Sequence, residues 1–301
     1  MRILILGASG QIGKELAWKL GHALPEVEII GTKRHLNPVF TLDEKPLAPT
    51  VRILAFDPFQ DDWEKLGKFS VVINAIGIIR ETPENSFVKI HGGLTQLLLQ
   101  NRKKLGNPKI IQFSVLGADE TSDSPFLQTK GLADSSLLKY PNTVVVRPSI
   151  VCTPNTVFVQ KLRLLRRISK FLGNQLPFPV NLLPIKIQPV MMDDIAELVL
   201  KLCTAAHHAN LINIAGPEAI SLQQFLDMLP VQGLRIRKLP RRAFDKMAGI
   251  LFRLCPNLLN SDQYKLLAHD NTTNISYCEY VLNRKMTDTL TFWRKELHRP
   301  Y

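Results

Sequence analysis

Gly7-Ala8-Ser9-Gly10-Gln11-Ile12-Gly13 follows the apolar run Ile3-Leu4-Ile5-Leu6 and precedes a stretch with helical spacing, Lys14 to Leu20. A buried strand, a glycine turn and a helix in this order form a cradle for phosphate groups, because the helix N-terminus supplies N–H donors and positive dipole. In this pattern the first glycine permits the tight turn, the second lets a ligand approach the backbone, and the third lets the helix pack on the strand. The context therefore predicts a dinucleotide site rather than an ordinary turn.

The end of the second predicted strand indicates which dinucleotide binds. Residues Val27 to Ile30 form an apolar run that leads into Gly31-Thr32-Lys33-Arg34. At this place an acidic residue binds the 2′-hydroxyl of the adenosine ribose, whereas basic residues accommodate a 2′-phosphate. The acid is missing here, so Lys33 and Arg34 favour NADP(H) over NAD(H). The alternative is an ordinary solvated pair of charges.

Further predicted strands cover residues 51–56, 71–77, 109–114 and 143–147, and residues 84–105 have helical spacing. Alternating strands and helices predict an α/β fold, a Rossmann-type doubly wound parallel sheet, with a smaller and mostly helical C-terminal region. Ligands bind at the C-terminal ends of such strands. The predicted cofactor-binding residues are Gly7, Ser9, Gly10, Gln11, Ile12, Gly13, Lys33, Arg34, Asp57, Ala75, Ile76, Gly77, Lys130 and Pro148.

Composition sets the outer limits of the prediction. The chain has 301 residues, 45% hydrophobic and 21% charged, as in globular proteins. It contains no apolar run of about 18 residues and begins directly with a strand, so we expect neither a membrane span nor a signal peptide. We expect free thiols and a cytoplasmic or equivalent reducing compartment, where the protein is either free or peripheral to a membrane. Four widely separated cysteines and the adjacent His207-His208 predict no metal site.

Several motifs together resemble the extended and atypical short-chain dehydrogenase/reductase superfamily over roughly residues 1–230. They include the glycine turn and the stretches Asn-Ala-Ile-Gly at 74–77, Arg-Pro-Ser-Ile-Val at 147–151 and Asn-Ile-Ala-Gly-Pro at 213–217. Within the superfamily, Ser-Val-Leu-Gly-Ala-Asp at 114–119 and Asp-Gln-Tyr-Lys-Leu-Leu-Ala-His-Asp-Asn at 262–271 look like proteins similar to the nucleotide-binding accessory subunit of respiratory complex I.

The resemblance also assigns the positions expected to carry chemistry. In the superfamily a Tyr transfers a proton, a Lys four residues later binds the nicotinamide ribose, and a Ser polarises the carbonyl. The matching positions here are Ser114, Phe126 and Lys130. Phenylalanine has no titratable group, so proton transfer worth roughly 10²–10⁴-fold has no evident agent. Ser114 and Lys130 could still bind a ligand.

The resemblance further implies a division into two domains. We predict an NADP(H)-binding Rossmann domain at 1–151 plus 189–214, and a smaller substrate or partner domain at 152–188 plus 215–301, where prolines become frequent.

Positive charge gathers in the last quarter of the chain. The whole chain carries +12, and residues 231–301 contain thirteen Lys or Arg against six Asp or Glu. Basic stretches occur at 161–170 and 235–242, and the second leads into a segment, 243–254, with helical apolar spacing. Such a helix docks on its own core, on an acidic protein partner or on an anionic membrane surface, so 235–255 is the candidate contact. The cations alternate with aliphatic rather than aromatic residues, so nucleic acid is not expected.

Two functions remain open from the sequence. The first is a cofactor-bound structural or redox-sensing protein with little classical dehydrogenase activity, because the tyrosine is missing. The second is an active NADP-dependent reductase, dehydratase, epimerase or other isomerase that acts on a small molecule with nonstandard acid–base groups.

Overall fold

The computed structural model describes residues 1–34, 46–153, 164–165, 167–205, 209–228, 232–242 and 266–298. Several predicted features lie outside these residues: His207-His208, Cys255, the segment 243–254 and part of the basic stretch 161–170. The chain divides into two compact units. Unit 1 contains residues 1–148, 192–214 and 276–284, and unit 2 contains residues 149–191, 215–275 and 285–301.

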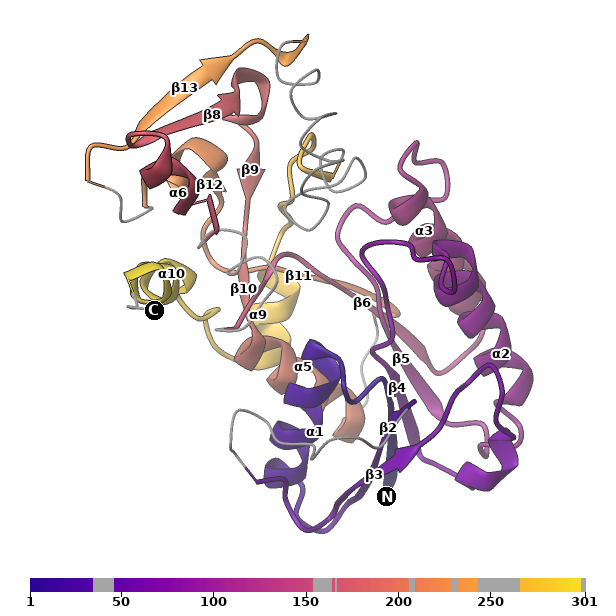
Figure 1. Ribbon diagram of the computed structural model, residues 1–301. Helices are drawn as coiled ribbons and strands as arrows, with labels where there is room; N and C mark the ends of the chain where they lie inside the picture. The colour runs from indigo at the N-terminus through magenta and orange to yellow at the C-terminus, as the bar shows by residue number, and fades with distance from the viewer. Residues whose placement is uncertain are drawn as a thin grey trace. The chain divides into compact units, whose positions relative to one another are not determined.

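Unit 1 is built on a seven-stranded sheet in the order β11-β6-β5-β4-β1-β2-β3, in which every neighbouring pair is parallel (Figure 1). The strands are β1 (Arg2–Leu6), β2 (Glu28–Lys33), β3 (Val51–Ala55), β4 (Val71–Asn74), β5 (Lys109–Phe113), β6 (Thr143–Pro148) and β11 (Leu211–Ile214). The strand order reverses at β1, which lies between β2 and β4. A crevice at such a reversal is where doubly wound sheets bind ligands.

Helices cover both faces of this sheet. They are α1 (Gln11–Ala23), α2 (Leu94–Asn101), α3 (Pro125–Leu138), α5 (Met192–Thr204) and α9 (Ser276–Leu282). In Figure 1, α1 and α5 lie against one face, and α2 and α3 lie against the other. Because both faces are covered, central strands must be apolar throughout, and Ile3 to Leu6 are indeed 0% exposed. The predicted Rossmann-type fold is confirmed.

The segment predicted to be helical over 84–105 forms two different kinds of helix. It begins with a π-helical segment, Val88–Gly93, which continues directly into α2. The apolar spacing predicts an inner face of Leu94, Leu97, Leu98 and Leu105, and of these Leu97 is half-buried and the other three are 0% exposed. The helical spacing therefore identified the buried face, but it did not predict the wider π-helical turns.

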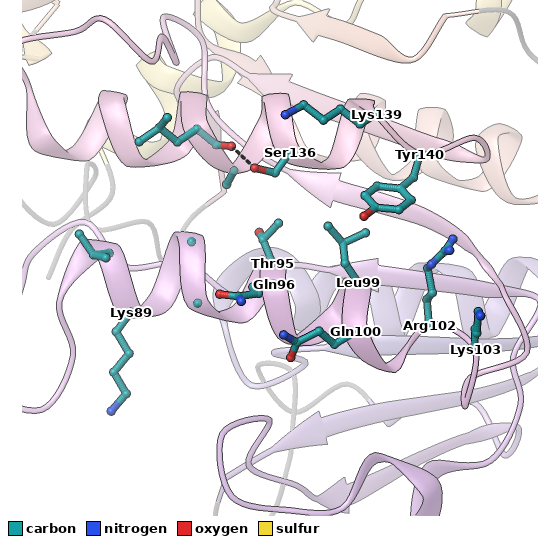
Figure 2. A pocket seen from close by; sticks show the side chains of 15 residues that line it. Lys89, Thr95, Gln96, Leu99, Gln100, Arg102, Lys103, Ser136, Lys139 and Tyr140 are labelled. Atoms are coloured by element: carbon teal, nitrogen blue, oxygen red, sulfur yellow. Dashed lines mark hydrogen bonds between the residues drawn. The ribbon is translucent and has the colours of Figure 1, made fainter.

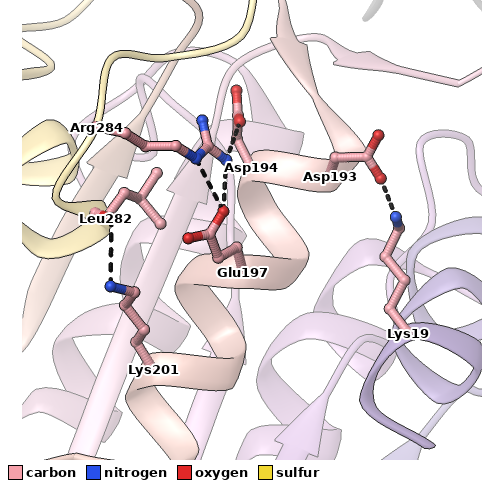
Figure 3. A network of polar contacts seen from close by, with 7 residues as sticks. All are labelled: Lys19, Asp193, Asp194, Glu197, Lys201, Leu282 and Arg284. Carbon is pink, nitrogen blue, oxygen red and sulfur yellow. Dashed lines mark hydrogen bonds and ion pairs between the residues drawn. The ribbon is translucent and has the colours of Figure 1, made fainter. Parts of the chain in front are cut away.

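Residues 276–284 belong to unit 1, whereas the sequence-based division placed all of 215–301 in the second domain. Figure 3 shows the contacts responsible. Arg284 Nη2 lies 2.8 Å from Oδ1 of Asp194, which is 0% exposed, and 2.5 Å from Oε2 of Glu197. Lys201 Nζ also donates a hydrogen bond of 3.2 Å to the carbonyl of Leu282. This return to α5 had no local sequence signal, because it joins residues about 90 positions apart.

Unit 2 combines short strands and helices around its own core. Its elements are β7 (Val151–Cys152), β8 (Gln175–Pro179), β9 (Lys186–Ile187), β10 (Val190–Met191), β12 (Ile220–Ser221), α6 (Leu222–Asp227), β13 (Arg235–Leu239) and α10 (Thr289–His298). The strands pair as β10-β7, β12-β9 and β13-β8. Trp293, 0% exposed, packs edge-to-face on Phe225 with ring centroids 5.3 Å apart. The basic run from Arg235 thus begins as a strand.

None of the helices in the described part of the chain combines the length and the apolarity that crossing a bilayer requires.

Candidate functional site

The glycine turn between β1 and α1 has a geometry that larger residues would disrupt. Gly7 has φ +80°, a left-handed conformation that favours glycine. A Cβ added to Gly13 would lie 2.3 Å from the Gly7 carbonyl oxygen, so close packing of α1 requires the third glycine. At Gly10 a Cβ would meet only that same oxygen, at 3.2 Å, and Ser9, Gly10 and Gln11 are exposed. The turn is therefore open on the side where a pyrophosphate would approach.

The start of α1 adds the electrostatic part of the cradle. Gly10 is the N-cap of α1, and no side chain caps this helix end. Ile12 lies in the first turn and is half-buried. Because a helix N-terminus presents backbone N–H groups and a positive dipole, this arrangement suits an anion. The described residues thus fit a dinucleotide at this turn.

The end of β4 lies beside the glycine turn. A Cβ on Gly7 would be 2.7 Å from the Ile76 side chain and 3.2 Å from its backbone nitrogen. The Asn74 side chain holds this segment, because its Oδ1 accepts a hydrogen bond of 3.1 Å from the Ile76 N–H. Ala75 and Ile76 are half-buried, and Gly77 is exposed. The structure therefore brings residues 75–77 to the strand-order reversal with the cradle.

The ends of β2 and β3 present three further predicted residues. Lys33 is only 8% exposed, whereas Arg34, directly after β2, is exposed. The carboxylate of Asp57 accepts a hydrogen bond of 3.0 Å from the backbone N–H of Phe59, so one oxygen of that group stabilises the local turn. Of the two adjacent cations, Arg34 is the one with its side chain in solvent.

Ser114 follows β5 and belongs to a buried polar chain. Its hydroxyl donates a hydrogen bond of 2.7 Å to Oδ2 of Asp134 on α3, and Arg147 Nε donates to the same oxygen at 2.8 Å. Ser114 is 4% exposed and Asp134 is 1% exposed. Burial raises the pKa of Asp134, an effect opposed by its bonds to Ser114 and Arg147. With its proton directed at Asp134, the Ser114 hydroxyl offers a ligand acceptor lone pairs rather than a donor.

The Lys130 side chain lies next to the segment that follows β4. Its Nζ donates a hydrogen bond of 3.1 Å to the carbonyl of Phe113, and a Cβ on Gly77 would be only 3.3 Å from this nitrogen. The side chain is 5% exposed. Burial lowers the pKa of Lys130 to about 8, and the nearby Asp134 carboxylate opposes this shift. Burial thus disfavours the charged form of Lys130, and this buried ammonium group is suited to donate hydrogen bonds to a polar ligand.

Phe126 lies one turn before Lys130 on α3 and is 4% exposed. Its ring packs edge-to-face on Phe87, at 5.5 Å between centroids, and on His91, at 5.6 Å. Burial, together with the charge of Lys130, lowers the pKa of His91 to about 3, against the opposing effect of the Ile78 backbone. The imidazole is therefore neutral at pH 7. It does not supply the proton that a tyrosine at position 126 would carry.

The His91 ring is oriented by the same helix. Its Nδ1 lies 2.9 Å from Oγ1 of Thr129, whose hydroxyl donates to the Pro125 carbonyl at 2.8 Å. Because that hydroxyl proton is used, Thr129 accepts from Nδ1–H, which sets the neutral tautomer. His91 is thus a packing partner of Phe126 whose Nδ1 proton is bound to Thr129.

The predicted residues gather at one edge of the sheet, and Pro148 is buried at the end of β6, where its carbonyl accepts from the Leu116 N–H at 3.1 Å. Sequence reasoning missed Asp134 and His91. Asp134 had a usable signal, because it is four residues after Lys130 and so shares its face of α3. His91 had none, because a lone histidine in a helical segment does not indicate its neighbours. Groups of three or more metal-ligating residues are absent from the described part of the chain.

Two kinds of relative are similar to this chain, although no protein-family model matches it. The first kind comprises complex I subunits. The chain is 25% identical over 243 residues to NADH dehydrogenase [ubiquinone] 1 alpha subcomplex subunit 9, mitochondrial, of Arabidopsis thaliana, covering 75% of this chain and 56% of the relative. It is 30% identical over 162 residues to the Dictyostelium discoideum protein of the same name, covering 53% and 43%. The matches thus span about half the length of these relatives.

The second kind comprises solved structures. A dTDP-glucose 4,6-dehydratase from Bacillus anthracis, in complex with NAD, has a TM-score of 0.70 at 17% identity, covering 99% of this chain and 95% of that one. A nucleoside-diphosphate-sugar epimerase from Staphylococcus aureus has a TM-score of 0.73 at 15% identity, covering 98% and 100%. The fold of this chain is therefore that of NAD-dependent epimerases and dehydratases, and its resemblance to the extended and atypical short-chain dehydrogenase/reductase superfamily, including complex I subunits, is confirmed.

Proposed function

We propose that this chain binds a dinucleotide, preferring NADP(H), and acts as a cofactor-bound structural or redox-sensing component with little classical dehydrogenase turnover. The bound cofactor would supply a hydride donor or acceptor at its nicotinamide ring. The chain itself would hold the pyrophosphate at residues 7–13 and the nicotinamide ribose at Lys130. Support for the binding half comes from the glycine turn, whose outer side is open backbone at the start of α1.

The observation that carries the proposal is the surroundings of Phe126. The ring is buried between Phe87 and His91, and neither neighbour offers a proton at neutral pH. Lys130 is nevertheless retained in a buried position that costs stability. A site that keeps its binding groups and lacks the proton donor is suited to hold a cofactor rather than to turn over a substrate.

The preference for NADP(H) rests on Arg34. This cation is exposed just after β2, where a 2′-phosphate would lie, and the buried Lys33 adds a second positive charge. A hydrogen bond between charged groups contributes about 1.5–3 kcal/mol, or roughly 10- to 100-fold in affinity.

Calorimetric titration of cofactor-stripped protein with NADPH and then NADH tests both parts. We expect NADPH to bind at least about tenfold more tightly, and Arg34→Ala to remove that difference while leaving NADH binding unchanged. Lys65→Ala, which removes an exposed cation from the 3-10 turn Trp63–Leu66, is the matched control. Equal affinities would reject the preference, and absence of binding by either dinucleotide would reject the proposal as a whole.

An active reductase, dehydratase or epimerase is the second candidate, and the Ser114–Asp134–Arg147 chain favours it. Asp134 is a buried carboxyl with a raised pKa, joined to the serine at the strand end by one hydrogen bond. A protonated Asp134 would donate to the Ser114 hydroxyl, which reverses the direction of this hydrogen bond and lets the serine donate its own proton to a ligand. Turnover of a nucleotide sugar that is lost in both Ser114→Ala and Asp134→Asn, with dinucleotide affinity intact, would favour this candidate over the first.

We also propose a protein partner, because complex I subunits are among the sequence relatives. Their names place those relatives in mitochondria. The contact through 235–255, with an acidic protein or an anionic membrane, stays a prediction, since most of that segment lies outside the described residues. Flotation with anionic vesicles, compared between the intact chain and one with Arg235, Arg237 and Lys238 changed to Gln, tests the membrane alternative.

A further inference from the structure

The strands β8 and β13 form a two-stranded parallel sheet in unit 2 (Figure 1). The register places Arg235 opposite Gln175 at one end and Leu239 opposite Pro179 at the other. Among the described residues no third strand joins this pair. Each of the two strands therefore has an outer edge whose backbone groups the sheet does not use, and such an edge can pair with another chain.

The hydrogen bonds between the two strands show which backbone groups point to the outer edges. The Arg235 N–H donates to the Asn174 carbonyl at 2.8 Å, so the backbone of Arg235 faces β8. In a strand, the N–H and C=O of one residue point to one side, and those of the next residue point to the other. The register therefore turns the backbone groups of Arg237 toward β8, and those of Ile236 and Lys238 toward the outer edge of β13.

The outer edge of β8 is closed to strand pairing by proline. The same alternation turns residues 175, 177 and 179 away from β13, and Pro177 and Pro179 have no N–H. Proline at an edge removes the donors that an added strand would need. β13 contains no proline, so its outer edge keeps the N–H donors of Ile236 and Lys238. Of these two edges, β13 has the one suited to accept another strand.

The open edge belongs to a cationic strand. Arg235, Arg237 and Lys238 are exposed, and neither β13 nor β8 contains an acidic residue. Because side chains alternate along a strand, Arg235 and Arg237 share one face, and Ile236 on the other face packs against the core of unit 2. Opposite charges on neighbouring strands attract, and like charges repel. The edge therefore favours a strand that has acidic side chains at every second position.

We propose that the outer edge of β13 binds an extended acidic segment of a partner protein, which adds a third strand to the β8-β13 sheet. The backbone groups of Ile236 and Lys238 would form hydrogen bonds with the segment. Its acidic side chains would lie beside Arg235 and Arg237, and its apolar side chains beside Ile236. In strand addition the backbone provides affinity, and alternate side chains provide specificity.

The inference rests on the partner contact proposed above and specifies how that contact is made, independently of the dinucleotide. A second copy of β13 is a poorer occupant of the edge. Since β13 has no acidic residue, no pairing of two β13 strands brings opposite charges together.

The test uses a fluorescent peptide of about nine residues in which Val and Glu alternate, so that it covers the five residues of β13 in more than one register. A twin peptide has Pro in place of two Val residues, which keeps every Glu and removes two backbone donors. By fluorescence anisotropy we expect the wild-type chain to bind the alternating peptide at least about tenfold more tightly than the twin.

Two substitutions at one position test the backbone of the edge. Lys238→Gln removes the charge and keeps the outward N–H, whereas Lys238→Pro removes both and leaves the hydrogen bonds to β8 in place. We expect Lys238→Pro to bind the alternating peptide at least about fivefold more weakly than Lys238→Gln. Thermal unfolding of each variant establishes that it is folded.

Two double variants test the charge. Arg235→Gln, Arg237→Gln should weaken the alternating peptide at least about tenfold. The matched control is Lys103→Gln, Lys139→Gln, which removes two exposed cations that line a pocket between α2 and α3 in unit 1 (Figure 2). This control should bind the peptide like the wild type.

The proposal is overturned if the wild type does not bind the alternating peptide, if the two Lys238 variants bind it equally, or if the two double variants lose equal affinity. Equal binding of the alternating peptide and its Pro twin, with a loss in Arg235→Gln, Arg237→Gln, would reject strand addition and leave an acidic partner contact standing. A dimer of the wild type in sedimentation that Lys238→Pro dissociates would assign the edge to a second copy and would also overturn the proposal.

Discussion

Replacing Lys130 by methionine should stabilise the protein at neutral pH. Methionine keeps the length of the side chain and removes a charge that is 5% exposed. Burial lowers the pKa of Lys130 from 10.5 to about 8. Each pKa unit corresponds to about 1.4 kcal/mol, so the folded state holds this charge at a cost of about 3 kcal/mol. The lost hydrogen bond to the Phe113 carbonyl offsets about 1 kcal/mol, which leaves a net gain of about 2 kcal/mol in Lys130→Met.

The pH dependence has a definite sign. Between pH 8 and 10.5 the unfolded chain binds more protons at this lysine than the folded chain does, so the free energy of unfolding of the wild type rises with pH. Below pH 8 both states are charged, and the full cost is present. Relative to Lys130→Met, the wild type should therefore regain about 2–3 kcal/mol as the pH is raised from 7 to 10.

Urea unfolding of the wild type and Lys130→Met at pH 7, 8, 9 and 10 measures this difference. Lys139→Met, an exposed lysine next to the end of the same helix, is the control and should stay within about 0.5 kcal/mol of the wild type at every pH. A difference between wild type and Lys130→Met that is constant across this range would refute the argument, as would a wild type that is the more stable at pH 7.

Three other expectations follow from the site and the core. Gly13→Ala should lower the free energy of unfolding by about 2 kcal/mol, because its Cβ would be 2.3 Å from the Gly7 carbonyl oxygen in the folded state; an unchanged urea midpoint would contradict this. Burial lowers the pKa of His91 to about 3, so below pH 6.5 the unfolded chain takes up a proton at this residue that the folded chain does not. Between pH 6 and 4 the free energy of unfolding of the wild type should therefore fall by about 1 kcal/mol per pH unit relative to His91→Phe. Parallel plots of the free energy of unfolding against pH for the two proteins would refute this. Burial raises the pKa of the Cys203 and Cys278 thiols to about 12, so both should stay unlabelled by a thiol reagent at pH 8 until denaturant is added, as mass spectrometry of the labelled peptides would report.

Local patterns predicted most of unit 1, because its strands, turns and helices are specified by residues that are close together in the sequence. The apolar run before Gly7 is long enough for one buried strand, and the glycine spacing belongs to one turn. The parallel sheet then follows, since alternating strands and helices allow few other arrangements.

Contacts between distant residues were out of reach from the sequence. The bond between Ser114 and Asp134 needs the end of β5 to meet α3, and the ion pair between Arg284 and Asp194 joins segments 90 residues apart. From the local sequence, each of these charged residues is expected at the surface. A charged side chain is buried where a partner compensates its charge, and here the partner is distant in the sequence. The π-helical segment Val88–Gly93 was likewise invisible, because its apolar spacing is also compatible with an α-helix.

The return of residues 276–284 to unit 1 has a consequence for biosynthesis. The chain passes between the units five times, at 148/149, 191/192, 214/215, 275/276 and 284/285. Unit 1 is therefore incomplete during translation until residue 284 has been made. Arg284, which pairs with Asp194, is translated 90 residues after it. A ribosome-bound chain stalled before this point would lack both α9 and the arginine that pairs with Asp194, so chaperones that recognise incomplete domains should remain associated with it until α9 has docked.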